Sequence, residues 1–172
     1  PPRSTLFPYT TLFRSGFSKT YAMTGWRLGY LRASRWLARR IIAFQSHTTS
    51  NATTFAQYGA MAALEGKADK EVEHMCAEFA KRRDLVFQLI SAIPGVKCIR
   101  PQGAFYLLCD VSSFGMSSEE FCNRLLAENK LAAIPCCSFG AEGQIRLSYA
   151  CSEATIREAA RRLEAFCKEH GN

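Results

Sequence analysis

Residues 16–29 read GFSKTYAMTGWRLG, and this stretch carries the strongest chemical signal in the chain. Lys19 stands among small and hydroxyl-bearing residues, and Arg27 follows in a Gly-x-Arg turn. A lysine amine can hold an aldehyde cofactor as a Schiff base, because it loses its proton when it is desolvated or placed near another cation. The planar guanidinium of an arginine can bind a phosphate group through two hydrogen bonds at once. The alternative is a pair of solvated cations flanking a turn, and the spacing alone leaves both interpretations open.

The composition is that of a folded protein with an uneven distribution of charge. The chain has 172 residues, 48% of them hydrophobic, and a net charge of +7. This length suits one domain or two small pieces of a larger one, and the apolar content excludes a wholly disordered chain. No apolar run of about 18 residues occurs, so we expect no membrane partner. The first acidic residue is Glu65, and the basic segment before it fits either a nucleic-acid surface or a phosphate site.

The eight cysteines follow no disulfide or metal-binding pattern. The sequence has no Cys-x-x-Cys pair and no signal peptide, and its three histidines have no metal-ligand spacing. Most of the cysteines lie in apolar periodic segments, where a thiol behaves as a small hydrophobic group. We therefore predict free thiols in a reducing cytoplasm, and no metal site.

The first fifteen residues differ in character from the rest. They read PPRSTLFPYTTLFRS, and residues 5–15 look like the translation of a sequencing-adapter oligonucleotide. Such a segment is excluded from reasoning about the fold. We expect the native protein to extend upstream of Gly16.

Hydrophobic periodicity predicts alternating helices and strands after this segment. Residues 16–32 are expected to form a strand or loop, a turn and a second strand. Helices are expected at 34–44, from 53 or 54 to 66, over 68–93, after a capping box formed by Ser117 and Glu120, and from Ser152 onward. Strands are expected at 105–110, 131–134 and 145–149, and residues 46–51 are expected to be a polar loop. The pattern from Pro94 onward therefore predicts a small α/β unit, in which helices pack on a β-sheet.

The stretch at 16–29 resembles the pyridoxal-phosphate attachment signature of class I aminotransferases, the fold-type I enzymes. The matching positions are Gly16, Ser18, Lys19, Ala22, Met23, Gly25, Arg27 and Gly29. By this resemblance Lys19 is the Schiff-base lysine, Arg27 binds the phosphate of pyridoxal 5′-phosphate, and Ser18 lies in the loop on the phosphate side. Relatives often carry a serine three residues before the lysine, where this chain has Gly16.

Three further segments are similar to the same family. Residues 46–51 resemble the loop that approaches the neighbouring subunit's site, and residues 101–106 resemble the entry to a strand of the small domain. Residues 139–149 resemble the substrate-carboxylate motif, which implies that Arg146 binds the substrate α-carboxylate. The residues agree, because Arg146 alternates with Ile145 and Leu147 and would face away from the core. The alternative is a surface arginine on an edge strand.

The resemblance implies an α/β fold, namely the C-terminal part of a fold-type I transferase. Its parts would be the adapter-like residues 1–15, a remnant of the large cofactor domain at 16–67, a long interdomain helix at 68–93, and the small domain at 94–172. The intact homodimer would transfer an amino group between an amino acid and a 2-oxo acid. The sequence looks most like the aspartate and aromatic aminotransferase branch.

Two departures bear on this interpretation. Cys136 stands where relatives usually have glycine, which tolerates a positive φ that cysteine adopts poorly. The family's carboxylate for the pyridine nitrogen lies before the lysine, and no carboxylate precedes Glu65 here. We therefore expect this chain by itself to be poorly stable and inactive.

Three other functions are considered. One is an aminotransferase-like effector-sensing domain of a transcriptional regulator, and another is a pyridoxal-phosphate-dependent lyase of the same fold, since fold does not fix the reaction. The third is a nucleic-acid-binding module that uses the arginines at 27, 32, 35, 39 and 40. The nearby aromatic residues form no known stacking motif, so we expect no nucleic-acid partner.

Overall fold

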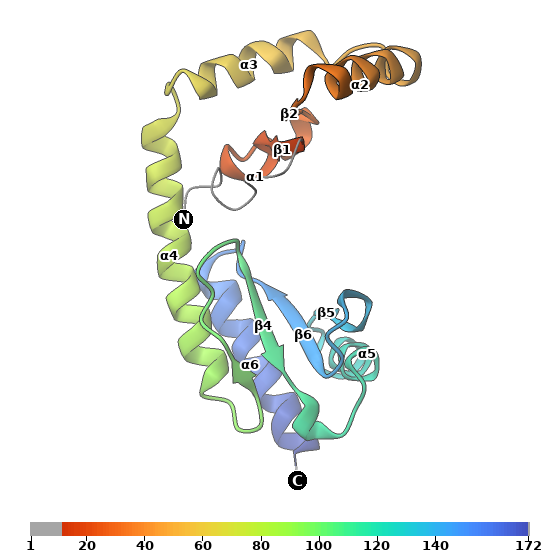
Figure 1. The fold of residues 1–172 in the computed structure, drawn as a ribbon. Coiled ribbons are helices and arrows are strands. Elements are labelled where there is room, and N and C mark those ends of the chain that lie inside the picture. The colour runs from red at the N-terminus through yellow and green to blue at the C-terminus, as the bar shows by residue number, and fades with distance from the viewer. Residues whose placement is uncertain (1–11, 172) are drawn as a thin grey trace. The chain divides into compact units, whose positions relative to one another are not determined.

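A computed structural model describes residues 12–171 of the chain (Figure 1). The chain divides into two compact units, Pro1–His74 and Met75–Asn172.

The first unit begins with an antiparallel ribbon. Strand β1 (Leu12–Gly16) pairs with strand β2 (Gly29–Ala33), and the pairing ends with Gly16 opposite Gly29. The connection between the strands contains helix α1 (Phe17–Thr20) and the 3-10 helix η1 (Thr24–Trp26). Residues 17–28 are therefore a loop whose two ends are held together by the last pair of the ribbon. Strand β1 includes part of the adapter-like stretch, whose origin stays a prediction, and residues 1–11 of that stretch lie outside the described residues.

Two helices complete the first unit, and the first of them is longer than expected. Helix α2 spans Arg35–Thr48 and helix α3 spans Thr54–Leu64. The prediction of a loop beginning at Ser46 is wrong, because α2 continues to Thr48. The Ser46 hydroxyl donates to the carbonyl of Ala43, and the Thr48 hydroxyl donates to the carbonyl of Phe44. These bonds back to the preceding turn satisfy the polar side chains within the helix.

Helix α4 (Asp69–Ser91) runs across the boundary between the units. Its bounds lie close to the predicted 68–93. The helix ends before Pro94, as expected, because proline has no N–H group with which to continue the helical hydrogen bonds.

The second unit is built on a four-stranded antiparallel sheet. The strand order is β3-β4-β6-β5, with all neighbours antiparallel. The strands are β3 (Lys97–Cys98), β4 (Tyr106–Asp110), β5 (Ile134–Pro135) and β6 (Gln144–Ser148). The helices of this unit after α4 are η2 (Ser112–Phe114), α5 (Ser118–Asn129), η3 (Cys137–Phe139) and α6 (Glu153–His170).

The two short edge strands are where the sequence-based expectation fails. Strand β3 was not predicted, because two residues are too few to show a period. The strand predicted at 131–134 is instead β5, which begins at Ile134. Lys130 takes a left-handed conformation at the end of α5, and the Leu131 amide donates to the carbonyl of Leu125. Leu131 is thus engaged in the helix cap and is not available to a strand.

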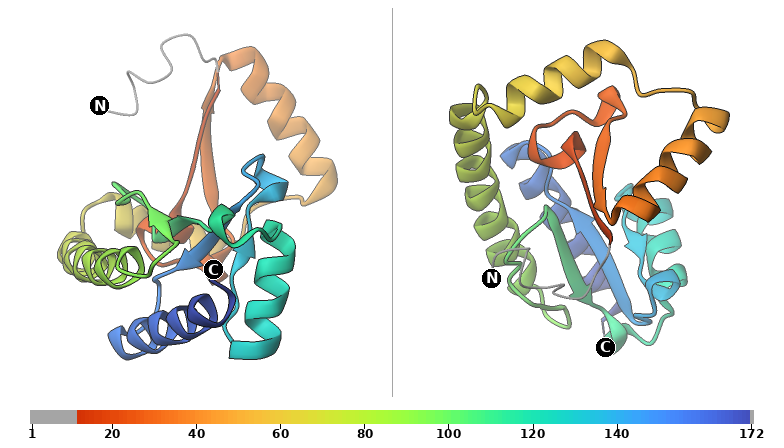
Figure 2. Two further views of the ribbon diagram at one scale, coloured as in Figure 1. Left: turned by 90° about the horizontal axis from the view of Figure 1, so that it is seen from below. Right: turned by 45° about the horizontal axis from the view of Figure 1, so that its top comes forward.

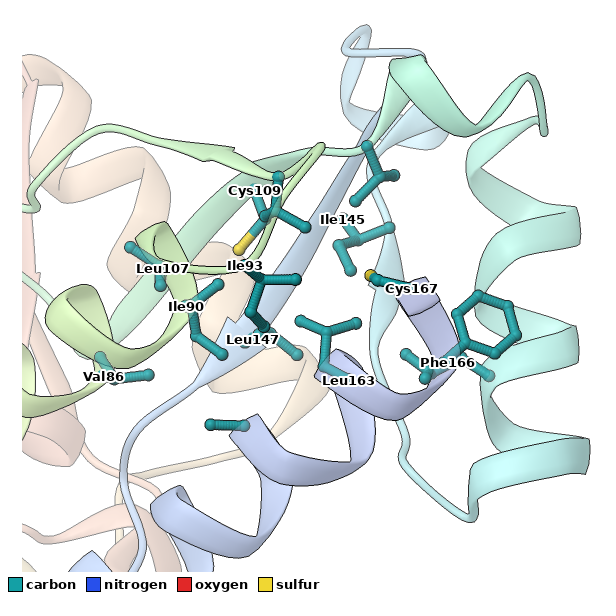
Figure 3. Close-up of a cluster of buried hydrophobic side chains, with 14 of the residues drawn as sticks. Val86, Ile90, Ile93, Leu107, Cys109, Ile145, Leu147, Leu163, Phe166 and Cys167 are labelled. Carbon is teal, nitrogen blue, oxygen red and sulfur yellow. The ribbon is translucent and has the colours of Figure 1, made fainter. Parts of the chain in front are cut away.

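The core of the second unit lies between one face of the sheet and its helices. Figure 2 shows α6 running along one face of the β4–β6 pair. Buried side chains from α4, β4, β6 and α6 converge there (Figure 3), among them Val86, Ile90, Leu107, Cys109, Ile145, Leu147, Leu163 and Phe166. Ile145 and Leu147 face this core, as the alternation predicts.

Serine caps fix the starts of three helices as the sequence indicates. The Ser34, Ser117 and Ser152 hydroxyls accept hydrogen bonds from the amides of Leu37, Glu120 and Thr155, respectively. Each bond satisfies one of the amides that lack a partner within the first turn of a helix.

We predict that Leu107→Ala lowers the free energy of unfolding of the second unit by about 2–5 kcal/mol, because the side chain is fully buried and leaves a cavity. Leu108→Ala on the same strand is the matched control, since Leu108 is 47% exposed on the opposite face and should cost about 1 kcal/mol or less. Urea unfolding of both variants measures the difference. Equal losses would contradict the assignment of the two faces.

Candidate functional site

Lys19 lies on the connection between β1 and β2. Helix α1 is a single turn that contains Ser18 and Lys19, and it follows Gly16 in an extended conformation. Lys19 is exposed and Ser18 is half-buried. The preceding residue, Phe17, is only 3% exposed. The hydrophobic Phe17 thus anchors the turn, and Lys19 lies on the exposed side of it.

A small apolar cluster holds this connection against α3. Its buried members are Phe17, Met23 and Ala60, and the partly buried Tyr21 and Leu28 pack against them. The Phe17 ring also lies 5.4 Å from the Tyr30 ring of β2, measured between centroids. The loop is therefore tied to both the ribbon and the helix, which restricts where Lys19 can move.

Arg27 sits at the other end of the same loop. Its φ of 53° is in the left-handed region, and its Nη1 atom donates to the carbonyl of Thr24 at 3.2 Å. Ala22 also has a left-handed φ, of 54°. Non-glycine residues adopt this conformation at a cost and are found where the surrounding structure enforces it, often at functional sites.

Trp26 fixes η1 to helix α3 beside Arg27. Its ring approaches Gly59 so closely that a Cβ atom at that glycine would lie 2.5 Å from the ring. The Trp26 and Phe55 rings are 6.0 Å apart between centroids. Gly59 is therefore needed for this close approach, and the packing holds the turn that carries Arg27.

The groups on this loop suit an aldehyde cofactor that bears a phosphate. Lys19 provides the amine that would bond the aldehyde carbon, and Arg27 provides a fork of N–H donors for phosphate oxygens. The half-buried Ser18 adds a hydroxyl to the same turn as Lys19. The donor set of the first unit thus fits pyridoxal 5′-phosphate in its chemistry.

Arg146 lies in the second unit, on a central strand of the sheet. It pairs with Leu108 of β4 on one side and with Ile134 of β5 on the other. It is half-buried, while its neighbours Ile145 and Leu147 are in the core. The alternative of an arginine on an edge strand is therefore wrong for this fold.

Two aromatic rings enclose the guanidinium of Arg146. Its Cζ atom lies 4.4 Å from the centroid of the Tyr106 ring and 5.0 Å from that of the Phe139 ring. A guanidinium close to a ring face is attracted by the electrons of the ring, and Arg stacks on such faces. Tyr106 and Phe139 hold the guanidinium in place, and sequence reasoning assigned neither residue a role. The signal was present, because both lie in the segments that resemble the family.

The loop that carries Phe139 is well closed by backbone hydrogen bonds. The Cys136 amide donates to the carbonyl of Gln144, and the amides of Phe139 and Ala141 donate to the carbonyl of Cys136. Cys136 has a φ of −94°, so cysteine in place of the usual glycine brings no backbone strain here. Gly140 supplies the left-handed conformation at the end of η3.

The predicted site residues fall into two groups in this structure. Ser18, Lys19 and Arg27 share one closed loop of the first unit, and Arg146 stands in the second unit. The segment at 46–51, expected as a loop near the partner subunit's site, begins within α2.

One cluster of possible metal ligands occurs among residues 12–171. Ligand atoms of Glu128, Glu169 and His170 lie within 4.8 Å of one another. Glu128 already pairs with Arg124 at 2.9 Å and with His170 at 2.7 Å. These ion pairs give the cluster a structural role at the ends of α5 and α6. Within the same described range, no helix is both long and apolar enough to cross a membrane.

Comparison with known proteins identifies the family. The model of the family described as "Aminotransferase class I and II" matches residues 3–163. An aspartate aminotransferase of Bacillus sp. (strain YM-2) is 43% identical over 163 residues, which cover 92% of this chain and 41% of that protein. Aromatic-amino-acid aminotransferase 2 of Thermococcus litoralis is 38% identical over 162 residues, with the same coverage of 92% and 41%.

A solved structure agrees with these matches. The aromatic aminotransferase from Pyrococcus horikoshii OT3 matches with a TM-score of 0.88 and 38% identity, over 92% of this chain and 43% of that one. The predicted α/β fold of fold-type I is confirmed. The chain spans about 41% of the length of the curated relatives cited above. From its sequence and its fold together, the chain belongs to the class I and II aminotransferase family.

Proposed function

We propose that this chain is part of a pyridoxal-phosphate-dependent aminotransferase that moves an amino group between an α-amino acid and a 2-oxo acid. The observation that carries the proposal is the closed loop of residues 17–28, which presents Lys19 and Arg27 on an anchored turn. Membership of the family adds independent support. The names of the relatives favour aspartate or an aromatic amino acid as substrate.

Lys19 is proposed as the catalytic residue. Its amine would hold the cofactor through the aldehyde carbon and be released when the substrate amine takes its place. The released Nζ would then remove the proton from the substrate Cα and deliver it on the cofactor side. When bound, pyridoxal phosphate supplies the sink for the electron pair left at Cα. The buried Phe17 holds the turn that bears Lys19, so the side chain starts from a fixed point of the backbone.

Arg27 and Ser18 are proposed to bind the phosphate of the cofactor. The guanidinium of Arg27 offers a charge-assisted fork, and the Ser18 hydroxyl lies on the turn that bears Lys19. The constrained backbone of Arg27 supports this role, because a strained residue persists only where the surroundings enforce it.

Arg146 is proposed to bind the α-carboxylate of the substrate. The rings of Tyr106 and Phe139 cover the guanidinium and limit its rotation. A preorganised cation pays less entropy on binding a carboxylate, so its contribution is to orient the Cα–H bond.

We propose further that the intact protein is a homodimer in the cytoplasm. Seven large apolar side chains on α2 and α3 are at least 52% exposed, namely Trp36, Ile42, Phe44, Phe55, Tyr58, Met61 and Leu64. So much exposed apolar surface is typical of a face that other protein covers, and a second copy of the chain is one partner that the family resemblance implies. All eight cysteines are free thiols, which supports a reducing cytoplasm.

The first experiment uses a chimaera in which residues 16–172 replace the matching part of the Bacillus sp. aspartate aminotransferase. We expect the chimaera to transaminate, and Lys19→Ala to lower kcat by at least about 10²-fold, because the proton carrier is lost. Borohydride reduction followed by peptide mapping should place the cofactor on Lys19. Lys67→Ala is the control and should retain activity, since Lys67 is an exposed lysine paired with Glu65. A covalent adduct that persists in the Lys19→Ala chimaera would refute the assignment.

In the same chimaera, Arg146→Lys should lower kcat/KM by about 10- to 100-fold, because an ammonium group cannot make the two-point contact with a carboxylate. Tyr106→Leu should raise KM with a smaller effect on kcat, since it loosens the guanidinium without removing it. Steady-state kinetics with aspartate and with an aromatic amino acid measure both effects. Unchanged KM values for both variants would place the carboxylate site elsewhere.

A further inference from the structure

Two cysteines lie directly opposite each other on neighbouring strands of the second unit. The register of β3 and β4 pairs Cys98 with Cys109. Residues opposite each other in an antiparallel pair have Cα atoms about 4.5–5.5 Å apart and point to the same face. Disulfide-bonded cysteines have Cα separations of about 4.4–6.8 Å. The backbone therefore already has the spacing that a cross-strand disulfide needs.

The two thiols differ in their access to solvent. Cys109 is fully buried, and Figure 3 shows its sulfur among the core side chains near Ile93. Cys98 is half-buried at the border of the same core. Cys98 is therefore the more exposed of the two thiols, and Cys109 is shielded within the core.

The chemistry of the pair is asymmetric in the same direction. A hydrogen bond from the Cys109 thiol lowers the pKa of Cys98 below its usual value. The same bond and burial raise the pKa of Cys109. Cys98 is thus the thiol that ionises and attacks, because the thiolate is the nucleophile.

We propose that Cys98 and Cys109 form a peroxide-reactive pair that is converted to a cross-strand disulfide. The Cys98 thiolate attacks one oxygen of hydrogen peroxide, the O–O bond breaks, and the departing hydroxide takes a proton to become water. Cys98 is then a sulfenic acid. The Cys109 sulfur attacks the Cys98 sulfur, the S–O bond breaks, and the Cys109 proton leaves with the hydroxide as a second water. The two thiols are oxidised by two electrons, and the peroxide is reduced.

The other thiols of the chain lack this combination. Burial raises the pKa of Cys167 to about 12, and burial together with neighbouring thiols raises that of Cys122 to about 11. Cys151 is half-buried against the core, as Cys98 is, but lies outside the strand pairs and has no cysteine opposite it. It is therefore the matched control. The inference rests on the second unit alone and does not depend on the proposed transaminase activity.

The test exposes the full 172-residue chain to graded hydrogen peroxide, alkylates the remaining thiols and maps the peptides without reduction. We expect the Cys98 and Cys109 thiols to disappear together into one cross-linked peptide pair, and a dithiol reductant to restore both. Cys151→Ser should leave the yield of this cross-link unchanged. In Cys109→Ser, Cys98 should be trapped by dimedone as a sulfenic acid, because no second thiol can resolve it.

Two substitutions of Cys98 test whether oxidation of Cys109 depends on that thiol. In Cys98→Ser and in Cys98→Ala, each checked for folding by circular dichroism, the loss of the Cys109 thiol should fall to that of buried Cys167. The proposal is overturned if Cys109 is still alkylated after Cys98 has been oxidised. Oxidation of Cys151 ahead of both, or a cross-link from Cys98 to any other cysteine, would overturn it as well.

Discussion

The antiparallel pairing of β4 with β6 is the constraint on which the second unit depends. Its register sets Leu108 opposite Arg146 and Tyr106 opposite Ser148, so Tyr106 and Arg146 are diagonal neighbours on one face. The alternate residues Leu107 and Cys109 of β4, and Ile145 and Leu147 of β6, form the side of the core that the sheet contributes. A slip of one residue would turn the apolar side chains out and the arginine in, at the cost of burying a charge. One pairing therefore secures both the core and the cation proposed to bind substrate.

The first unit depends on a comparable constraint of smaller extent. The pairing of Gly16 with Gly29 closes the loop of residues 17–28, and Phe17 and Trp26 dock it on α3. Only a short ribbon and a small cluster support this loop, whereas α2 has no buried residue at all. The apolar side chains exposed on α2 and α3 are consistent with a unit that is completed by further protein. The anchored loop is nonetheless a defined local structure, because its ends and its middle are each tied down.

The cysteines show how a residue type can have different roles in one small unit. Cys136 closes a loop through its backbone and adopts an ordinary φ, so its side chain replaces glycine without strain. Cys109 fills the core as a small hydrophobic group, and the register of β3 adds Cys98 beside it. Nothing in the spacing of Cys98 and Cys109 along the chain distinguishes them from the other thiols, since cross-strand neighbours are defined by pairing and not by separation.

The sequence by itself determined the family, the helices with their serine caps, and the alternation that places Arg146 on the opposite face of its strand from Ile145 and Leu147. These follow from local patterns, since capping and alternation act between residues a few positions apart. Only the tertiary structure decided that α2 continues through Ser46, that Leu131 belongs to a helix cap, and that β6 is a central strand. It alone brought Tyr106 and Phe139 onto the guanidinium of Arg146 and set Cys98 opposite Cys109. Those contacts join segments up to about forty residues apart in the sequence, and their partners are chosen by strand register and core packing, which no local period encodes.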